Sequence, residues 1–209
     1  MKKLGLLVCL TVGFSASVFA KGDAQAGEGL VTSKGCVACH GADGNSPLDI
    51  YPSIAGQHAE YIAKQLKELK LGGETAGAEG RYDPVMSSQA ALLNEQEMLD
   101  LAAYFATQEA KPGTTPEDVV EKGGELYRGG DLERGITACI ACHGPRGNGL
   151  GLAGFPDISG QKAAYLKSQL EKFKAGTRAN DLNGMMRDIA TKLTDEDIET
   201  LSQYLGGLH

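Results

Sequence analysis

The chain contains one five-residue pattern twice, as Cys36-Val37-Ala38-Cys39-His40 and as Cys139-Ile140-Ala141-Cys142-His143. The pattern C-x-x-C-H is typical of the attachment site of a c-type haem. Its two thiols can form thioether bonds to the haem vinyl groups, and the adjacent histidine can bind the iron. We therefore predict two covalently bound haem c groups. The predicted cofactor-binding cysteines are Cys36, Cys39, Cys139 and Cys142, and the predicted iron-binding histidines are His40 and His143.

The first twenty residues have the pattern of an export signal. Lys2 and Lys3 precede a mostly apolar run over residues 4–14, and Val18-Phe19-Ala20 resembles a cleavage site for signal peptidase. We therefore predict that residues 1–20 are a signal peptide of an exported protein. A retained membrane anchor is the alternative, but 17 residues between Lys3 and Lys21 are short for a membrane-spanning helix.

The two motifs belong to a longer internal repeat. His40 and His143 are 103 positions apart, and six pairs of residues that follow them are 104 positions apart. These pairs are Pro52/Pro156, Gly56/Gly160, Gln57/Gln161, Tyr61/Tyr165, Gln65/Gln169 and Leu66/Leu170. Three further pairs, Leu93/Leu193, Leu101/Leu201 and Tyr104/Tyr204, are 100 positions apart. A repeat of this kind predicts a duplicated domain.

The boundary between the two copies is predicted from helix-breaking residues. Residues 111–116 contain two prolines and a glycine, which interrupt any helix. We therefore predict an N-terminal domain at residues 21–110, a linker at residues 111–116 and a C-terminal domain at residues 117–209.

Each copy is predicted to be entirely helical. Short helices are expected before the motifs, over residues 24–33 and 116–127. After each motif, apolar residues at steps of three and four predict an amphipathic helix. The last helix of each copy is expected to begin at Asn94 or Thr194, each followed three residues later by an acidic side chain. The predicted fold class is all-α, with two tandem domains that each wrap around a covalent haem.

The second axial ligand of each iron must come from a short set of candidates. They are His58, Met86 and Met98 in the first copy, and Met185, Met186 and His209 in the second. Met86 and Met186 each stand eight residues before the N-cap of the last helix, whereas Met185 misses that register by one. We predict Met86 and Met186 as the ligands, in loops ahead of the last helices, with Met185 as the alternative for the second.

The remaining candidates do not fit the repeat. Met98 corresponds to Ile198, so we expect it to pack in the core. His58 corresponds to Lys162, which cannot be an equivalent ligand, and His209 has no counterpart in the first copy.

The predicted ligands and the charge point to electron transfer. Coordination by histidine and methionine raises the reduction potential and leaves no open position for a substrate, which favours an electron carrier over an enzyme. The formal charge is −7, and residues 21–110 alone carry 6 basic and 13 acidic side chains. Nucleic-acid partners are excluded, because they require a basic surface.

With these motifs the chain resembles the cytochrome c4 family, the exported dihaem members of the class I cytochromes c. The resemblance covers nearly all of the chain after residue 20, including Pro52-Ser53-Ile54-Ala55-Gly56-Gln57 and Pro156-Asp157-Ile158-Ser159-Gly160-Gln161. It implies two cytochrome c folds related by a pseudo-twofold axis, with the haem propionates near the interface. It also implies that the Pro52 and Pro156 carbonyls accept hydrogen bonds from the iron-binding histidines. The segment before Met186 lacks the proline of the Pro84-x-Met86 pattern, so we expect the second ligand loop to be looser.

The same resemblance implies a function. It is that of a periplasmic carrier of single electrons between respiratory redox proteins, a donor complex and a terminal oxidase, with peripheral association to the membrane left open. One alternative is the dihaem cytochrome subunit of a larger redox enzyme, such as a flavin-dependent sulfide dehydrogenase. A haem enzyme such as a peroxidase is the other, and it requires an accessible iron.

Overall fold

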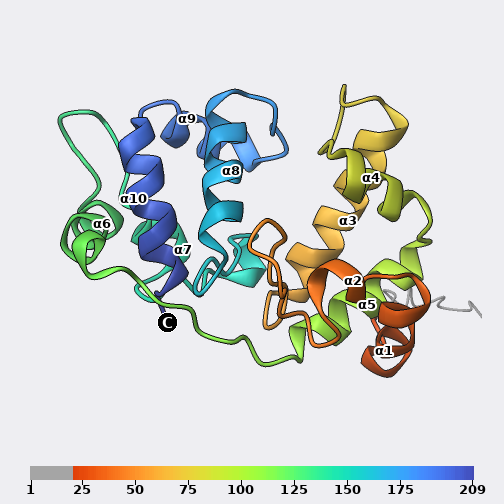
Figure 1. The fold of residues 1–209 in the computed structure, drawn as a ribbon. Helices are drawn as coiled ribbons and strands as arrows, with labels where there is room; N and C mark the ends of the chain where they lie inside the picture. Colours follow the sequence, from red (N-terminus) through yellow and green to blue (C-terminus); the bar gives the residue numbers. More distant parts are fainter. Residues whose placement is uncertain (1–20) are drawn as a thin grey trace, which may run out of the picture.

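The computed structural model describes residues 21–209, and the predicted signal peptide at residues 1–20 lies outside this part of the chain. Figure 1 shows two helical halves side by side, joined by an extended strap along one edge. Between residues 21 and 209 the only β pairing consists of two isolated bridges, Asp131 with Ile136 and Leu150 with Phe155. The predicted all-α fold class is therefore confirmed.

The helices occur in the same order in both halves. The N-terminal half contains α1 (Ala24–Ser33), α2 (Val37–His40), α3 (Ala59–Glu74), α4 (Pro84–Ala91) and α5 (Glu95–Ala106). The C-terminal half contains α6 (Glu117–Gly129), α7 (Ile140–His143), α8 (Ala163–Lys174), α9 (Met185–Ala190) and α10 (Asp195–Gly206), with 3-10 turns η1 (Gly151–Ala153) and η2 (Leu182–Gly184). Residues 111–116 lie in no helix and form the strap. Among residues 21–209, no helix combines the length and the hydrophobicity that crossing a membrane requires.

Each half closes around its own apolar core. In the first, Val31 of α1, Leu66 of α3, and Leu101 and Phe105 of α5 are buried together. Met98 belongs to the same cluster with 1% of its surface exposed, which confirms that it packs in the core. The second core contains equivalent residues, among them Tyr127, Leu166, Leu201 and Tyr204.

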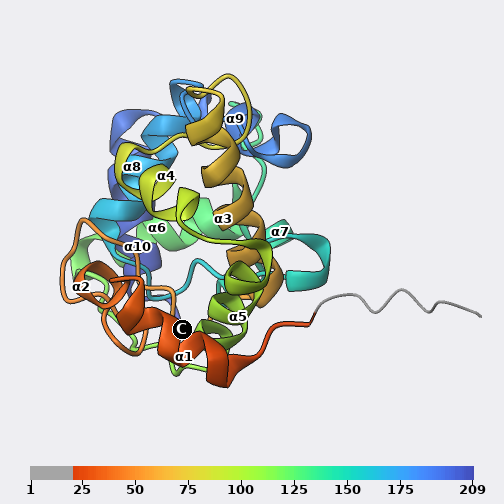
Figure 2. The same ribbon diagram turned by 90° about the vertical axis from the view of Figure 1, so that its right-hand side faces the viewer.

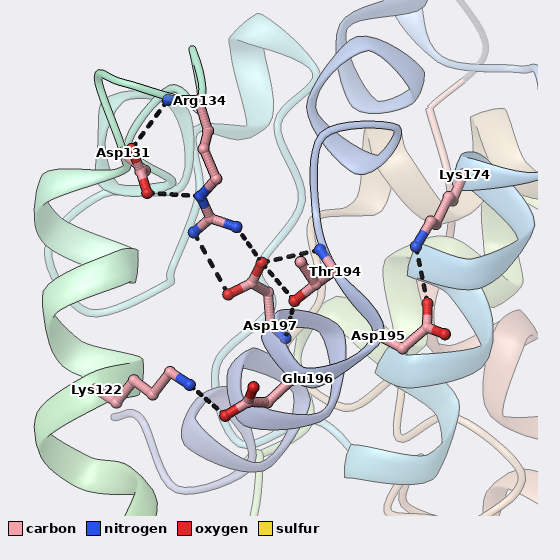
Figure 3. A network of polar contacts seen from close by, with 8 residues as sticks. All are labelled: Lys122, Asp131, Arg134, Lys174, Thr194, Asp195, Glu196 and Asp197. Atoms are coloured by element: carbon pink, nitrogen blue, oxygen red, sulfur yellow. Dashed lines mark hydrogen bonds and ion pairs between the residues drawn. The ribbon is translucent and has the colours of Figure 1, made fainter.

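Both terminal helices begin with the capping box predicted from the sequence. Asn94 and Glu97 cap α5 reciprocally, and Thr194 and Asp197 do the same for α10. In the second half the cap has an additional partner, because Arg134 pairs with the buried Asp197 and so fastens the loop after α6 to α10 (Figure 3).

The two halves meet along α3 and α8. Figure 2 looks onto the N-terminal half and shows α3 in front, with the C-terminal helices behind it. Hydrogen bonds join each of these helices to the loop that follows the other, for example from Lys64 Nζ of α3 to the Asn180 carbonyl at 3.0 Å. The haem-attachment motifs therefore lie in separate cores that share one polar interface.

Candidate haem-binding sites

The first motif forms one helical turn with its histidine turned inward. His40 ends α2 and is only 7% exposed. Its Nδ1–H donates to the Pro52 carbonyl oxygen at 2.9 Å, as expected. Since the Nδ1 position is occupied by this bond, the Nε2 lone pair is the one available to a metal.

The His40 side chain lines a cavity of about 450 Å³, a volume that includes the solvent space at the cavity's mouth. Three potential haem-binding side chains reach this cavity, namely Cys36, His40 and Met86. The rest of the wall is mostly apolar, with Ile54, Ile62, Leu66, Ala90, Leu93, Leu101 and Phe105. Cys39 is half-buried on the same helical turn. One thiol, an imidazole nitrogen and a thioether sulfur at an apolar cavity, with a second thiol on the same helical turn, fit a covalently attached haem.

The second motif repeats the helical turn and the histidine–proline hydrogen bond in α7. His143 is 8% exposed, and its Nδ1–H donates to the Pro156 carbonyl oxygen at 3.0 Å. Cys139 is half-buried against the core of the C-terminal half, and Cys142 is half-buried on the same turn. The hydrogen bonds expected at Pro52 and Pro156 are thus both present.

Burial adjusts the protonation of the motif residues. Desolvation lowers the pKa of His40 and of His143 below the usual value, although the bond to the proline carbonyl acts in the opposite direction. Both imidazoles are therefore kept neutral, which is the form that binds iron. Burial also raises the pKa of the Cys139 thiol to about 11.

The two predicted methionine ligands lie in helices, so the expectation that they lie in loops is wrong. Met86 is in the first turn of α4, where the Asp83 carboxylate accepts hydrogen bonds from the backbone N–H groups of Val85 and Met86 at 3.2 and 3.1 Å. Pro84 occupies the first helical position, where its fixed φ favours helix formation. An Asp-Pro pair therefore starts a helix here and holds Met86 at the cavity that also contains His40.

The second pair of methionines is held differently. Met185 and Met186 begin α9 after Gly184, which has a left-handed φ of 71° and provides no side-chain cap. Instead the Asp181 carboxylate accepts from the Arg187 backbone N–H at 3.0 Å and from its Nε at 2.8 Å. A side-chain anchor thus replaces the missing proline, and both methionines are half-buried.

The other ligand candidates lie elsewhere. His58 Nε2 donates across the interface to the Asn148 carbonyl at 2.8 Å. His209 is exposed, with its ring against the Gly207 carbonyl. Neither side chain lines the cavity at the first motif, and Met98 does not line it either.

Two arginines that sequence analysis missed lie between α3 and α8. Arg81 donates to Gln65 and Gln169, both at 2.8 Å. Arg178 is 6% exposed and donates to Gln169 at 2.9 Å and to Tyr61 at 3.0 Å. Within residues 21–209 neither guanidinium forms an ion pair, so two largely buried cations have only neutral acceptors. Such a pair favours an anion nearby, and haem carries two carboxylates.

The two arginines do not occupy equivalent positions in the repeat. Arg81 and Arg178 are 97 positions apart, whereas the pairs around them are 104 or 100 positions apart. The sequence signal that could identify them is local, since each arginine follows an amphipathic helix and precedes a methionine.

Comparison with known proteins places the chain in a family. The cytochrome c family model matches residues 24–109 and again residues 120–209. Cytochrome c4 of Thiocapsa roseopersicina is 47% identical over 199 residues, covering 95% of this chain and 99% of that protein. A thiosulfate dehydrogenase electron acceptor of Thiomonas intermedia is 37% identical over 174 residues, covering 81% of this chain and 76% of that protein.

A solved structure agrees with these sequence matches. Reduced recombinant cytochrome c4 of Pseudomonas stutzeri superimposes with a TM-score of 0.86 at 44% identity, covering 90% of this chain and all of that one. Two cytochrome c domains carry two covalent haem c groups, and an electron carrier of this kind exchanges electrons with other redox proteins. The chain therefore belongs to the cytochrome c4 family of dihaem electron carriers.

Proposed function

We propose that this protein carries single electrons through the periplasm from a respiratory donor to a terminal oxidase. The observation that carries the proposal is the pair of buried histidines, each hydrogen-bonded to a proline carbonyl at the end of a C-x-x-C-H turn. The export pattern in residues 1–20 supports the periplasmic location.

The proposal assigns a role to each site residue. Thioether attachment falls to Cys36 and Cys39 for the first haem, and to Cys139 and Cys142 for the second. Iron coordination falls to His40 and Met86 in the first domain, and to His143 and Met186 in the second. Bound haem supplies a one-electron redox centre, whose potential is raised by a histidine and a methionine ligand.

The chain's own residues prepare the site for electron transfer. The proline carbonyls fix the orientation of the two imidazoles, and apolar side chains keep water from the metal. A bound haem iron that took both a histidine and a methionine ligand would leave no position for a substrate. Arg81 and Arg178 would supply positive charge for the haem carboxylates, because within residues 21–209 both are largely buried and neither forms an ion pair.

Single methionine substitutions of the purified dihaem protein test the ligands. We expect the oxidised native protein to show a methionine-to-iron absorption band, and Met86→Ala and Met186→Ala each to lose about half of it. Met98→Leu is the control and should retain the full band. A loss with Met185→Ala but not with Met186→Ala would contradict the predicted register in the second domain.

The oxidase is tested with membranes. We expect solubilised respiratory membranes to oxidise the reduced protein with consumption of oxygen, and cyanide to stop the reaction. Membranes that leave the reduced protein unchanged would refute the oxidase as acceptor.

A second role is favoured by one comparison. The relative from Thiomonas intermedia is named as the electron acceptor of a thiosulfate dehydrogenase. In that role a dehydrogenase reduces the protein, which is the reaction also expected of a subunit of a flavin-dependent sulfide dehydrogenase. Co-purification of a dehydrogenase in a fixed ratio, together with thiosulfate- or sulfide-dependent reduction, distinguishes this role from a freely diffusing carrier.

A further inference from the structure

Two glutamine side chains cross the interface between the domains, one in each direction. Gln161 Oε1 accepts from the Ser53 N–H at 2.9 Å, and its Nε2 donates to the Ser53 carbonyl at 2.7 Å. Gln57 makes the same two bonds to Asp157, at 3.0 and 2.7 Å. Each glutamine thus pairs with the backbone of one residue in the opposite domain.

The residues they reach directly follow the prolines that hold the iron-binding histidines. The Pro52 carbonyl and the Ser53 N–H are the two ends of one peptide group. Its oxygen accepts from His40 Nδ1 at 2.9 Å, and its N–H donates to Gln161. A continuous hydrogen-bonded chain therefore runs from His40 through one peptide group into the other domain.

The second chain runs in the opposite direction. The Pro156 carbonyl accepts from His143 Nδ1 at 3.0 Å, and the N–H of the same peptide group donates to Gln57. Gln57 is 8% exposed, so this chain is shielded from water.

Both glutamine amides are fixed by a further bond within their own domain. Gln57 Oε1 also accepts from the His58 N–H, and Gln161 Oε1 from the Lys162 N–H, each at 3.0 Å. Because each amide is held on both sides, it can hold the opposite peptide group in one orientation.

The electronic consequence follows from the resonance of the peptide bond. An acceptor at the N–H end increases the negative charge on the carbonyl oxygen, since the peptide is delocalised and hydrogen bonds in a chain strengthen one another. A stronger bond at Nδ1–H makes the imidazole a better electron donor to the metal. Better donation stabilises the oxidised iron and lowers its reduction potential.

We propose that Gln161 is a positioning residue for His40 and Gln57 a positioning residue for His143, so that each domain tunes the reduction potential of the haem in the other. The inference rests on the proposed function, in which His40 and His143 bind the irons. It predicts a crossed effect, because the glutamine of one domain acts on the haem of the opposite domain.

Other contacts should keep the domains together when one glutamine is lost. Arg178 still bonds to Tyr61, Lys64 to the Asn180 carbonyl, and His58 to the Asn148 carbonyl. A single substitution should therefore change the local polarisation without separating the domains.

The experiment is a potentiometric titration of the full dihaem protein, with NMR of the haem methyl groups to distinguish the two haems. Gln161→Met keeps the length of the side chain and removes its hydrogen bonds. At a fixed potential we expect it to raise the ratio of reduced to oxidised N-terminal haem about twofold, or about 20 mV for one electron, with a smaller change at the C-terminal haem. Gln57→Met should raise the same ratio for the C-terminal haem, with the smaller change at the N-terminal haem.

Two further variants complete the design. Gln161→Asn keeps a polar amide but is too short to span the interface, so it should also raise the reduction potential of the N-terminal haem. This variant provides the test if Gln161→Met does not fold. Gln203→Met is the matched control, because Gln203 bonds to Glu199 within α10 and should leave both potentials unchanged.

Each outcome decides. Unchanged potentials, a larger shift in the substituted domain's own haem, or equal shifts in both haems would overturn the crossed relay. A native protein without the methionine-to-iron band contradicts the proposed ligands instead. A normal band without a crossed shift contradicts only the relay.

Discussion

Gly27 of α1 packs directly against the backbone of α5, and its replacement by alanine should destabilise the N-terminal domain. A Cβ on Gly27 would lie 2.1 Å from the Asp100 backbone oxygen and 2.7 Å from Tyr104 Cβ. Because a backbone oxygen cannot rotate away, the helices would have to separate. Overpacking of this kind costs about 3 kcal/mol, and the better helix propensity of alanine returns about 1 kcal/mol. We therefore expect a net loss of about 2 kcal/mol.

Gly29 offers a control in the same helix. A Cβ there would meet nothing within 4 Å, so Gly29→Ala should stabilise the domain by up to about 1 kcal/mol. Thermal unfolding of the dihaem protein, followed by circular dichroism and haem absorbance, measures both. For a domain of this size, these changes in stability should lower the melting temperature by about 10 °C for Gly27→Ala and raise it by a few degrees for Gly29→Ala. Equal melting temperatures for the two variants would refute the steric argument.

Three further predictions concern charged side chains. Burial raises the pKa of Asp83, but the Met86 N–H and Lys172 together hold this pKa below the usual value. In urea unfolding above pH ~4, the free energy of unfolding of the native protein should therefore exceed that of Asp83→Asn by about 0.5 kcal/mol. The difference should vanish as the pH falls through the pKa of Asp83 in the folded protein. Asp197→Ala should lower the free energy of unfolding by about 2 kcal/mol, because the Asp197 carboxylate accepts from the Thr194 N–H and from Arg134. Removing the exposed Asp195 in the same helical turn (Figure 3) should leave the unfolding midpoint unchanged. Arg178→Met should lower the haem potentials in a redox titration, since it removes a buried positive charge; unchanged potentials would argue against its proposed role at the haem carboxylates.

Local signals in the sequence were sufficient for most of the fold. The capping boxes at Asn94 and Thr194 follow from side-chain chemistry within four residues, and the structure has both. The core position of Met98 followed from the repeat, because Ile198 occupies the same place in the second copy. Such inferences succeed where a residue's role depends on its neighbours along the chain.

Other features could not be predicted from those signals. Asp83-Pro84 is an N-cap followed by the first helical residue, yet the sequence pattern predicts a loop before Met86, because α4 is too short to show a hydrophobic period. Arg81 and Arg178 were missed for a different reason. Each has partners in the opposite domain as well as in its own, and contacts over about 100 positions leave no periodic trace in a single sequence.

The crossed contacts have the geometry of a symmetric dimer within a single chain. Gln57 and Gln161 occupy equivalent positions in the repeat, and so do Ser53 and Asp157. Gln161 bonds to Ser53 in the N-terminal domain, and Gln57 bonds to Asp157 in the C-terminal domain. In an isologous interface one patch meets its own copy, so every contact occurs twice. A change to either patch therefore alters both sides of one interface, although each domain has a separate core. The two haem sites should for this reason be treated as one coupled unit when substitutions are interpreted.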